Sequence, residues 1–140
     1  MRISARCDYA CKAVLELTFH WPKETPLRLQ VISKRQGIPL KYLPQILVQL
    51  KRMGIVESIR GNQGGYILAR APEKISLGEL VREINGPLLP AANSARKRES
   101  GFASIWNEAE EATAAVLDRI TFRDISEKVK GREKTIVYEI

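Results

Sequence analysis

The sequence predicts a mainly α fold with one small β-hairpin and a long helix toward its C-terminal end. Three observations carry this prediction. Apolar residues recur at helical spacing over most of residues 3–53 and again in residues 76–86. Residues 55–70 instead read as two short alternating segments joined by a glycine-rich tip, as in a hairpin. From residue 102 onward, apolar residues recur at alternating intervals of four and three.

Two helices are expected at the start of the chain. The first spans Ile3 to His20, where apolar side chains share one face, and Pro22 ends the pattern. The second begins near Leu29 and stops at Gly37, because glycine readily adopts the left-handed conformation that ends many helices.

A third helix is expected from about residue 40 to Met53. Pro44 requires the helix to begin nearby, because proline is tolerated only in or close to the first turn. Its apolar face consists of Leu43, Ile46, Leu47 and Leu50. The short connection to the preceding helix is typical of a helix-turn-helix. Since the hairpin follows directly, the sequence predicts a winged helix-turn-helix.

A fourth helix is expected after the hairpin. Ser76 and Glu79 have the spacing of a capping box, in which each side chain bonds the other residue's backbone N–H. The sequence Asn85-Gly86-Pro87 ends this helix. The long helix then runs from Phe102 to about Ile120.

The C-terminal segment is expected to contain a short helix from Phe122 to Val129 and a fraying tail from Gly131. Residues 135–138 could instead pair as a strand. The predicted organisation is a winged helix-turn-helix domain over 1–86, a loop over 87–101, a long dimerisation helix with a short terminal helix over 102–130, and a tail over 131–140.

The long helix carries an apolar seam that points to pairing with a second chain. The seam consists of Phe102, Trp106, Ala109, Thr113, Val116 and Ile120. A chain of 140 residues has little core left to receive such a stripe, so we expect a homodimer through this helix. The alternative is that the stripe packs onto its own domain.

The charge is divided unevenly along the chain. Residues 1–74 hold 13 Lys and Arg against 5 Asp and Glu, whereas residues 75–140 hold 10 against 11. The basic excess therefore lies in the half that contains the helix and hairpin, as binding to phosphates requires. A solvated basic surface is the alternative.

Composition also limits the classes of protein to consider. No apolar run is long enough for a membrane span or resembles a signal peptide, so we expect no membrane partner and a cytoplasmic location. The single His20 excludes catalysis by two histidines, and the carboxylates of the long helix lie on a face predicted to be exposed. We therefore do not expect an enzyme.

The predicted outer face of the third helix and the hairpin tip offer side chains that can reach DNA. Residues in the first turns of such a helix contact base edges, and arginine at a hairpin tip can enter a narrow minor groove. The candidate DNA contacts are Arg28, Lys41, Tyr42, Gln45, Gln49, Arg60, Gly61, Asn62 and Gln63. An ordinary solvated helix face remains the alternative for the helix. A nucleotide-binding loop is excluded, because the glycines lie between strands and no Gly-Lys-Ser/Thr follows.

Four stretches of the chain resemble one protein family. They are Met1-Arg2-Ile3-Ser4 with Tyr9-Ala10, the run 32–38, the helix with Tyr42 and Gln45-Ile46-Leu47, and the hairpin with Arg60-Gly61 and Gly64-Gly65-Tyr66. They are similar to the Rrf family of bacterial winged-helix transcription regulators, which includes IscR, NsrR and CymR. The resemblance implies a dimer on a palindromic operator, base reading by Tyr42 and Gln45, and a wing contact by Arg60.

The chain departs from the family pattern in the loop before the long helix. Many members hold an iron–sulfur cluster there through three cysteines, but residues 88–101 contain no cysteine. We therefore expect no cofactor, and the chain resembles the cluster-less branch, which responds to a protein partner, a thiol or an unknown ligand. Cys7 and Cys11 share a helix face and are candidates for a redox role, although free cysteines on helices are commonly small buried hydrophobes. No metal site is expected.

These observations together predict a homodimeric, sequence-specific DNA-binding transcription regulator, a repressor that binds a pseudo-palindromic operator in double-stranded DNA. The alternative is a protein–protein docking module of a regulatory complex that uses the same fold without direct DNA readout.

Overall fold

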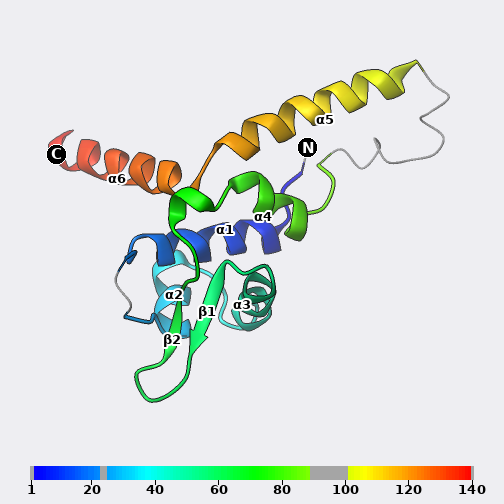
Figure 1. Ribbon diagram of the computed structural model, residues 1–140. Coiled ribbons are helices and arrows are strands. Elements are labelled where there is room, and N and C mark those ends of the chain that lie inside the picture. The colour runs from blue at the N-terminus through cyan, green and yellow to red at the C-terminus, as the bar shows by residue number, and fades with distance from the viewer. Residues whose placement is uncertain (1, 23–24, 89–100, 140) are drawn as a thin grey trace.

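A computed structural model describes residues 2–22, 25–88 and 101–139, with side chains up to residue 132 (Figure 1). The elements in chain order are α1 (Ala5–Thr18), α2 (Leu29–Gln36), α3 (Leu43–Arg52), β1 (Val56–Ile59), β2 (Gly65–Leu68), the 3-10 helix η1 (Pro72–Lys74), α4 (Leu77–Ile84), α5 (Phe102–Arg119) and α6 (Phe122–Glu139). The predicted order of three helices, a hairpin, a fourth helix and a long helix is confirmed. Most of the predicted loop, residues 89–100, lies outside the described residues.

Helix α1 is the centre of the fold. It begins after Ser4, whose hydroxyl accepts a hydrogen bond from the backbone N–H of Cys7 at 3.1 Å. Its small and apolar residues Ala10, Ala13 and Val14 are fully buried. The helix therefore contacts α2, α3, α4 and α6.

The connection between α2 and α3 is a tight turn. Gly37 adopts a left-handed conformation with φ of 65°, and the N–H of Ile38 donates to the carbonyl of Ser33 at 3.0 Å. Residues 40–42 continue as a turn, so α3 begins at Leu43 and not near residue 40 as predicted. Pro44 lies in its first turn, as expected.

The inner face of α3 forms much of the core. Its four predicted apolar residues are each at most 1% exposed, namely Leu43, Ile46, Leu47 and Leu50. They lie in one cluster with Ile55 and Val56 of the hairpin and with Phe122 of α6. Burial of this face fixes which side of α3 remains open to solvent.

The hairpin pairs Val56 with Leu68 and Ile59 with Gly65 in antiparallel register. An additional bridge joins Tyr66 to Leu27, with N–H to carbonyl distances of 2.8 and 3.0 Å in the two directions. A Cβ atom at Gly65 would clash with the carbonyl oxygen of Leu27. Glycine at this position therefore allows the segment before α2 to pair with the hairpin.

The predicted capping box at α4 is only half formed. The hydroxyl of Ser76 accepts from the N–H of Glu79 at 3.1 Å, but the Glu79 carboxylate binds Arg70 instead of returning to Ser76. A reciprocal box occurs at α6, where Thr121 N–H donates to the Asp124 carboxylate and Asp124 N–H donates to the Thr121 hydroxyl.

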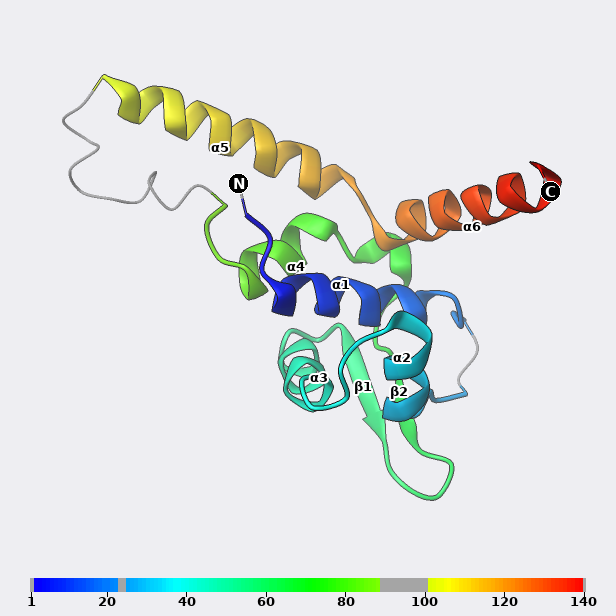
Figure 2. The same cartoon turned by 180° about the vertical axis from the view of Figure 1, so that it is seen from behind.

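Helix α5 lies over α4 on the side of the molecule opposite the hairpin (Figures 1 and 2). The last helix, α6, is longer than predicted and continues to Glu139, so neither a fraying tail from Gly131 nor a strand over 135–138 is present. Arginine, glutamate and lysine after Gly131 are good helix formers, which explains the continuation. No helix of the described segments has both the length and the apolar character needed to cross a bilayer.

Candidate nucleic-acid interface

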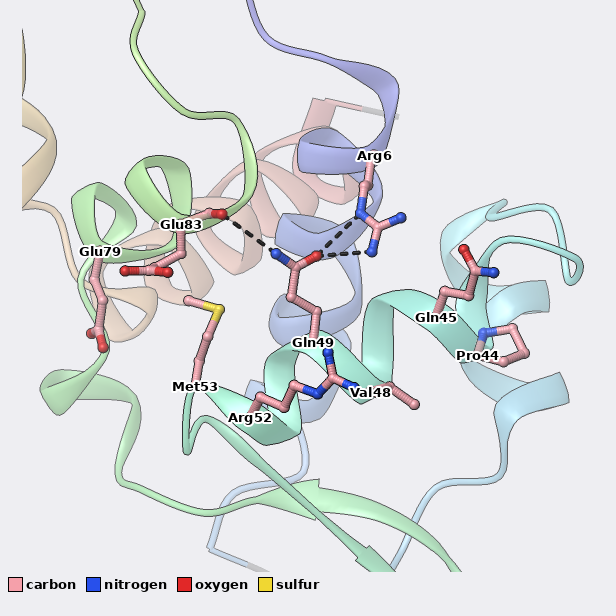
Figure 3. Close-up of a pocket in the computed structure, with 9 residues that line it drawn as sticks. All are labelled: Arg6, Pro44, Gln45, Val48, Gln49, Arg52, Met53, Glu79 and Glu83. Carbon is pink, nitrogen blue, oxygen red and sulfur yellow. Dashed lines mark hydrogen bonds between the residues drawn. The ribbon is translucent and has the colours of Figure 1, made fainter.

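The outer face of α3 lines an open groove. The groove has a volume of about 890 Å³ and is bounded by side chains from α1, α3 and α4 (Figure 3). Pro44, Gln45, Val48 and Arg52 are its exposed residues on α3. Since the opposite face of α3 is buried in the core, these side chains are held toward solvent by the fold itself.

Tyr42 is held at the start of α3 by an aromatic contact. Its ring stacks on that of Tyr9 with centroids 6.1 Å apart and an interplanar angle of 16°. The ammonium of Lys41 lies 4.9 Å from the centroid of the Tyr42 ring. The tyrosine remains 47% exposed, so its ring is positioned but still available to a partner.

Gln45 and Gln49 differ although both were predicted to contact DNA. The Gln45 side chain is exposed and forms no hydrogen bond within the described part of the chain. The Gln49 carbonyl oxygen accepts from Arg6 Nε at 3.1 Å and Nη2 at 2.9 Å, and its amide donates to the Glu83 carbonyl at 3.4 Å. Figure 3 shows Gln49 turned toward α1 and α4. A DNA contact by Gln49 would require these bonds to break, so it is a positioning residue in this structure.

The hairpin tip presents the predicted wing residues to solvent. The exposed tip residues are Arg60, Gly61, Asn62 and Gln63. Arg60 has no hydrogen-bond or ion-pair partner among the described residues. Gly64 closes the tip through its N–H to the Gly61 carbonyl at 3.0 Å. The Arg60 guanidinium is therefore free to bind an external acceptor.

Arg28 braces the wing. It precedes α2, and its guanidinium donates to the backbone carbonyl of Asn62 at the tip. Arg28 is also a predicted DNA contact, and its remaining N–H groups can still donate to a phosphate. Lys51 joins α3 to the hairpin in a similar way, because its ammonium donates to the Ser58 hydroxyl at 2.9 Å.

Arg70 is a structural residue that the sequence analysis missed. Its guanidinium donates to the carbonyls of Met53 and Gly54 at 3.2 and 3.3 Å, and to the Glu79 carboxylate at 2.7 and 3.0 Å. The hydrogen-bonded Glu79 carboxylate raises the pKa of Arg70. Nothing in the local pattern signals this role, because an arginine after a strand normally faces solvent.

His20 contributes to a clasp between α1 and α2. The carboxylate of Glu16 is buried and lies 3.1 Å from His20 Nε2, while Arg35 and Gln36 donate to it at 3.3 and 3.0 Å. These donors offset part of the cost of removing the carboxylate from water, so the loss of one of them would leave a buried charge poorly compensated.

The two cysteines face the interior. Cys7 is fully buried beside Val81 and Leu88, and Cys11 is half-buried against the same cluster. The hydrogen bond with the neighbouring Cys7 thiol, followed by burial, raises the pKa of Cys11. Within residues 2–22, 25–88 and 101–139, no three histidine, cysteine or acidic side chains come together in a group that could hold a metal.

Most of the seam predicted on α5 is exposed in the single chain, whereas Thr113 and Ile120 are half-buried. None of the 18 residues of α5, all within the described range, is buried. Phe102, Trp106 and Val116 are 63%, 42% and 47% exposed, and the first two rings stack on each other. Ile105, also exposed, was not part of the predicted seam.

A different face of α5 contacts α4. Arg82 of α4 donates to the Asp118 carboxylate at 2.9 Å. The helices approach so closely that a Cβ atom on Gly78 would clash with Asp118. The contact with α4 thus leaves most of the predicted seam open to a partner, except at Ile120, whose carbonyl accepts from the N–H of Leu77 at 2.8 Å.

Comparison with known proteins places this architecture among transcription regulators. The family model Rrf2, described as "Iron-dependent Transcriptional regulator", matches residues 3–128. A putative HTH-type transcriptional regulator of Rhodobacter capsulatus, described as rrf2-like, is 43% identical over 90 residues, which are 63% of this chain and 60% of that protein.

Two solved structures are similar over nearly the whole chain. IscR of T. potens is 33% identical, with a TM-score of 0.76 over 92% of this chain and 88% of that one. CymR of B. subtilis, titled the global cysteine regulator, is 29% identical, with a TM-score of 0.79 over 91% of this chain and 98% of that one. The similarity confirms the predicted winged helix-turn-helix fold and extends through α5.

Proposed function

Because the chain belongs to the Rrf2 family of transcriptional regulators, we propose that it acts as a homodimeric repressor on a pseudo-palindromic operator. The observation that carries the proposal is the open face of α3 beside a wing with an unpaired Arg60. DNA binding as a class follows from the family, whereas the dimer, the operator symmetry and the sign of regulation are the proposal. A cytoplasmic location is part of it, since the proposed target is chromosomal DNA.

In the proposed complex, α3 of each subunit enters a major groove. Tyr42 and Gln45 face the base edges, and the free amide of Gln45 has the donor and acceptor needed for bidentate bonding to adenine. Lys41 and Arg52 supply positive charge for the flanking phosphates.

The wing lies beside the helix and reaches the adjacent minor groove. Arg60 inserts there, where narrow A·T-rich stretches concentrate negative potential. Gly61 has no Cβ atom, so the backbone N–H groups of the tip can approach a phosphate. Arg28 holds the tip through the Asn62 carbonyl and thereby limits the freedom that Arg60 loses on binding.

Dimerisation is proposed to occur through the α5 seam. Large apolar side chains such as Phe102 and Trp106 are costly to leave in water, and pairing of two seams buries them. A two-fold dimer positions two α3 helices for two half-sites, which predicts the pseudo-palindrome.

We further propose that this chain works without an iron–sulfur cluster, although its family is described as iron-dependent. The residues do not fit such a group, because the whole chain has two cysteines and both lie on α1. Cys7 is fully buried among apolar side chains, and residues 88–101 contain no cysteine that could complete a ligand set with it. An unidentified effector or protein partner would then control DNA binding.

The test is selection of duplexes from a random DNA pool by the anaerobically purified full-length protein, together with its iron and sulfide content. The proposal expects enrichment of one pseudo-palindrome bound by two chains, with no stoichiometric iron. Failure to enrich any sequence would instead support the docking module. A brown protein with stoichiometric iron and sulfide would contradict the cluster-less mechanism.

A further inference from the structure

Val48 is an exposed apolar residue on the otherwise polar part of α3. Its side chain is 49% exposed, whereas Ile46 and Leu47 immediately before it are 1% and 0% exposed. Figure 3 shows Val48 pointing away from α1 and α4, unlike its neighbour Gln49. The valine therefore contributes nothing to the core and faces the open groove.

The position of Val48 relative to the proposed base-contacting residues is informative. Gln45 precedes it by three residues and Arg52 follows it by four, so all three occupy neighbouring turns of one face. All three line the same groove. If α3 enters a major groove, an assumption that rests on the function proposed above, Val48 reaches the groove between the contacts of Gln45 and Arg52.

The chemistry of valine limits what it can recognise there. It has no donor or acceptor, so opposite an amino or keto group it would leave that group without a partner, at a cost in affinity. The one apolar group that unmodified DNA presents in its major groove is the C5 methyl of thymine. We propose that Val48 reads the methyl group of a thymine in each half-site and is a specificity-determining residue.

The proposal is tested on the duplex that the wild-type protein enriches from a random synthetic pool. Each thymine of one half-site is replaced singly by deoxyuridine, which removes the methyl and keeps every hydrogen-bonding group. Thymine is the only methylated base in such DNA, so the source of the methyl is unambiguous. At one position the replacement is expected to weaken binding about fourfold, the effect of burying one methyl group.

The variant Val48→Ala tests whether Val48 is the side chain that contacts this methyl group. With this variant, replacement of the same thymine is expected to cost less than about twofold, because its contact is already lost. Arg60→Ala is the matched control. It should weaken binding to every duplex, but replacing that thymine by deoxyuridine should still weaken its binding about fourfold, as for the wild type. Unchanged circular dichroism and melting temperature establish that Val48→Ala is folded, as expected for an exposed helix position.

The outcomes separate this inference from the function on which it rests. Equal penalties for wild type and Val48→Ala at every thymine, or no penalty at any thymine, would overturn the role of Val48 and leave operator binding intact. If the wild-type protein enriches no duplex, both the proposed function and this inference are wrong.

Discussion

At the scale of single residues, the DNA-facing surface depends on side chains that do not themselves face DNA. Arg70 bonds the carbonyls of Met53 and Gly54 at the end of α3, and also the Glu79 carboxylate of α4. These carbonyls have no other partner within α3, because a helix leaves its last carbonyls unbonded. Arg70 therefore fixes the end of α3 against α4.

Arg70→Ala is expected to lower the free energy of unfolding by about 2 kcal/mol, because several charge-assisted hydrogen bonds are lost and helix-end carbonyls remain unpaired. Urea denaturation at fixed protein concentration measures the change. Arg82→Ala is the control: its pair with Asp118 is largely exposed, so it should change stability by less than about 1 kcal/mol. An equal effect of the two variants would contradict the role assigned to Arg70.

At the scale of elements, the hairpin depends on close backbone approach. Gly65 lies against the carbonyl of Leu27, with which its neighbour Tyr66 pairs. The bridge connects the wing to the segment that leads into α2, where Arg28 binds the tip. The orientation of the wing is thus fixed from two points.

Gly65→Ala is expected to destabilise the protein by about 1–3 kcal/mol, because the added methyl forces the Leu27 segment away. DNA binding should fall further than the loss of stability alone explains. Gly131→Ala is the matched control: its added methyl meets no atom within 4 Å, and alanine in a helix should raise stability by up to about 1 kcal/mol. Thermal melting and a binding titration measure both effects. Unchanged melting temperature and DNA affinity in Gly65→Ala would contradict the role assigned to this glycine.

The start of α6 predicts a specific dependence on pH. Hydrogen bonds from Thr121 lower the pKa of Asp124. Because the folded-state pKa lies below the unfolded one, the stabilisation is complete above the unfolded value of about 3.9 and disappears as pH falls through the folded value. Asp124→Asn should therefore be less stable than wild type at pH 7, and the difference should shrink as the Asp124 carboxylate becomes protonated in acid.

Urea midpoints at a series of pH values measure this effect. Glu57→Gln is the control, since Glu57 is exposed and forms no hydrogen bond within the described residues. A constant difference between Asp124→Asn and wild type across the range would exclude a charged capping box.

The sequence was sufficient to predict the elements whose signals are local. The periodicity of α3, the glycines of the wing and the stripe on α5 each lie within one segment, and these elements were predicted correctly apart from the start of α3. The exposure of Gln45 and Arg60 to a binding partner could also be inferred. It depends only on which face of α3 is buried and on which residues form the hairpin tip.

What could not be predicted depends on partners from distant segments. Gln49 has the same local pattern as Gln45, but Arg6 of α1 and the Glu83 carbonyl of α4 bind its amide. Glu79 has the spacing of a capping box, but Arg70 competes for its carboxylate. Helix α6 is longer than predicted because the helix formers after Gly131 continue the helix past this glycine.

At the scale of the whole molecule, the proposed DNA-binding surface and the proposed dimer surface lie on opposite sides (Figures 1 and 2). Helix α1 lies between them and contacts α3 as well as α4, on which α5 packs. A change in the packing of α5 on α4 would therefore be transmitted to α3 through the contacts of α4 with α1 and of α1 with α3. The separation also lets two chains pair through α5 without covering either α3.

Trp106→Glu is expected to convert the dimer to a monomer, because it places a charge in the apolar seam. Sedimentation would then give half the wild-type mass, and operator affinity should fall by at least about tenfold, since one half-site alone remains bound. Glu111→Ala, an exposed change on another face of α5, should leave the mass unchanged. If the Trp106→Glu protein remains a dimer, the α5 seam is not the dimer interface.

The central claim is that α3 and the wing together hold DNA, and the salt dependence of operator binding by wild type and Arg60→Ala tests it most directly. The wild-type dissociation constant should rise steeply with salt, as release of counterions requires. Arg60→Ala should bind at least about tenfold more weakly and with a shallower salt dependence. Binding that does not respond to salt, or that Arg60→Ala leaves unchanged, would contradict the account.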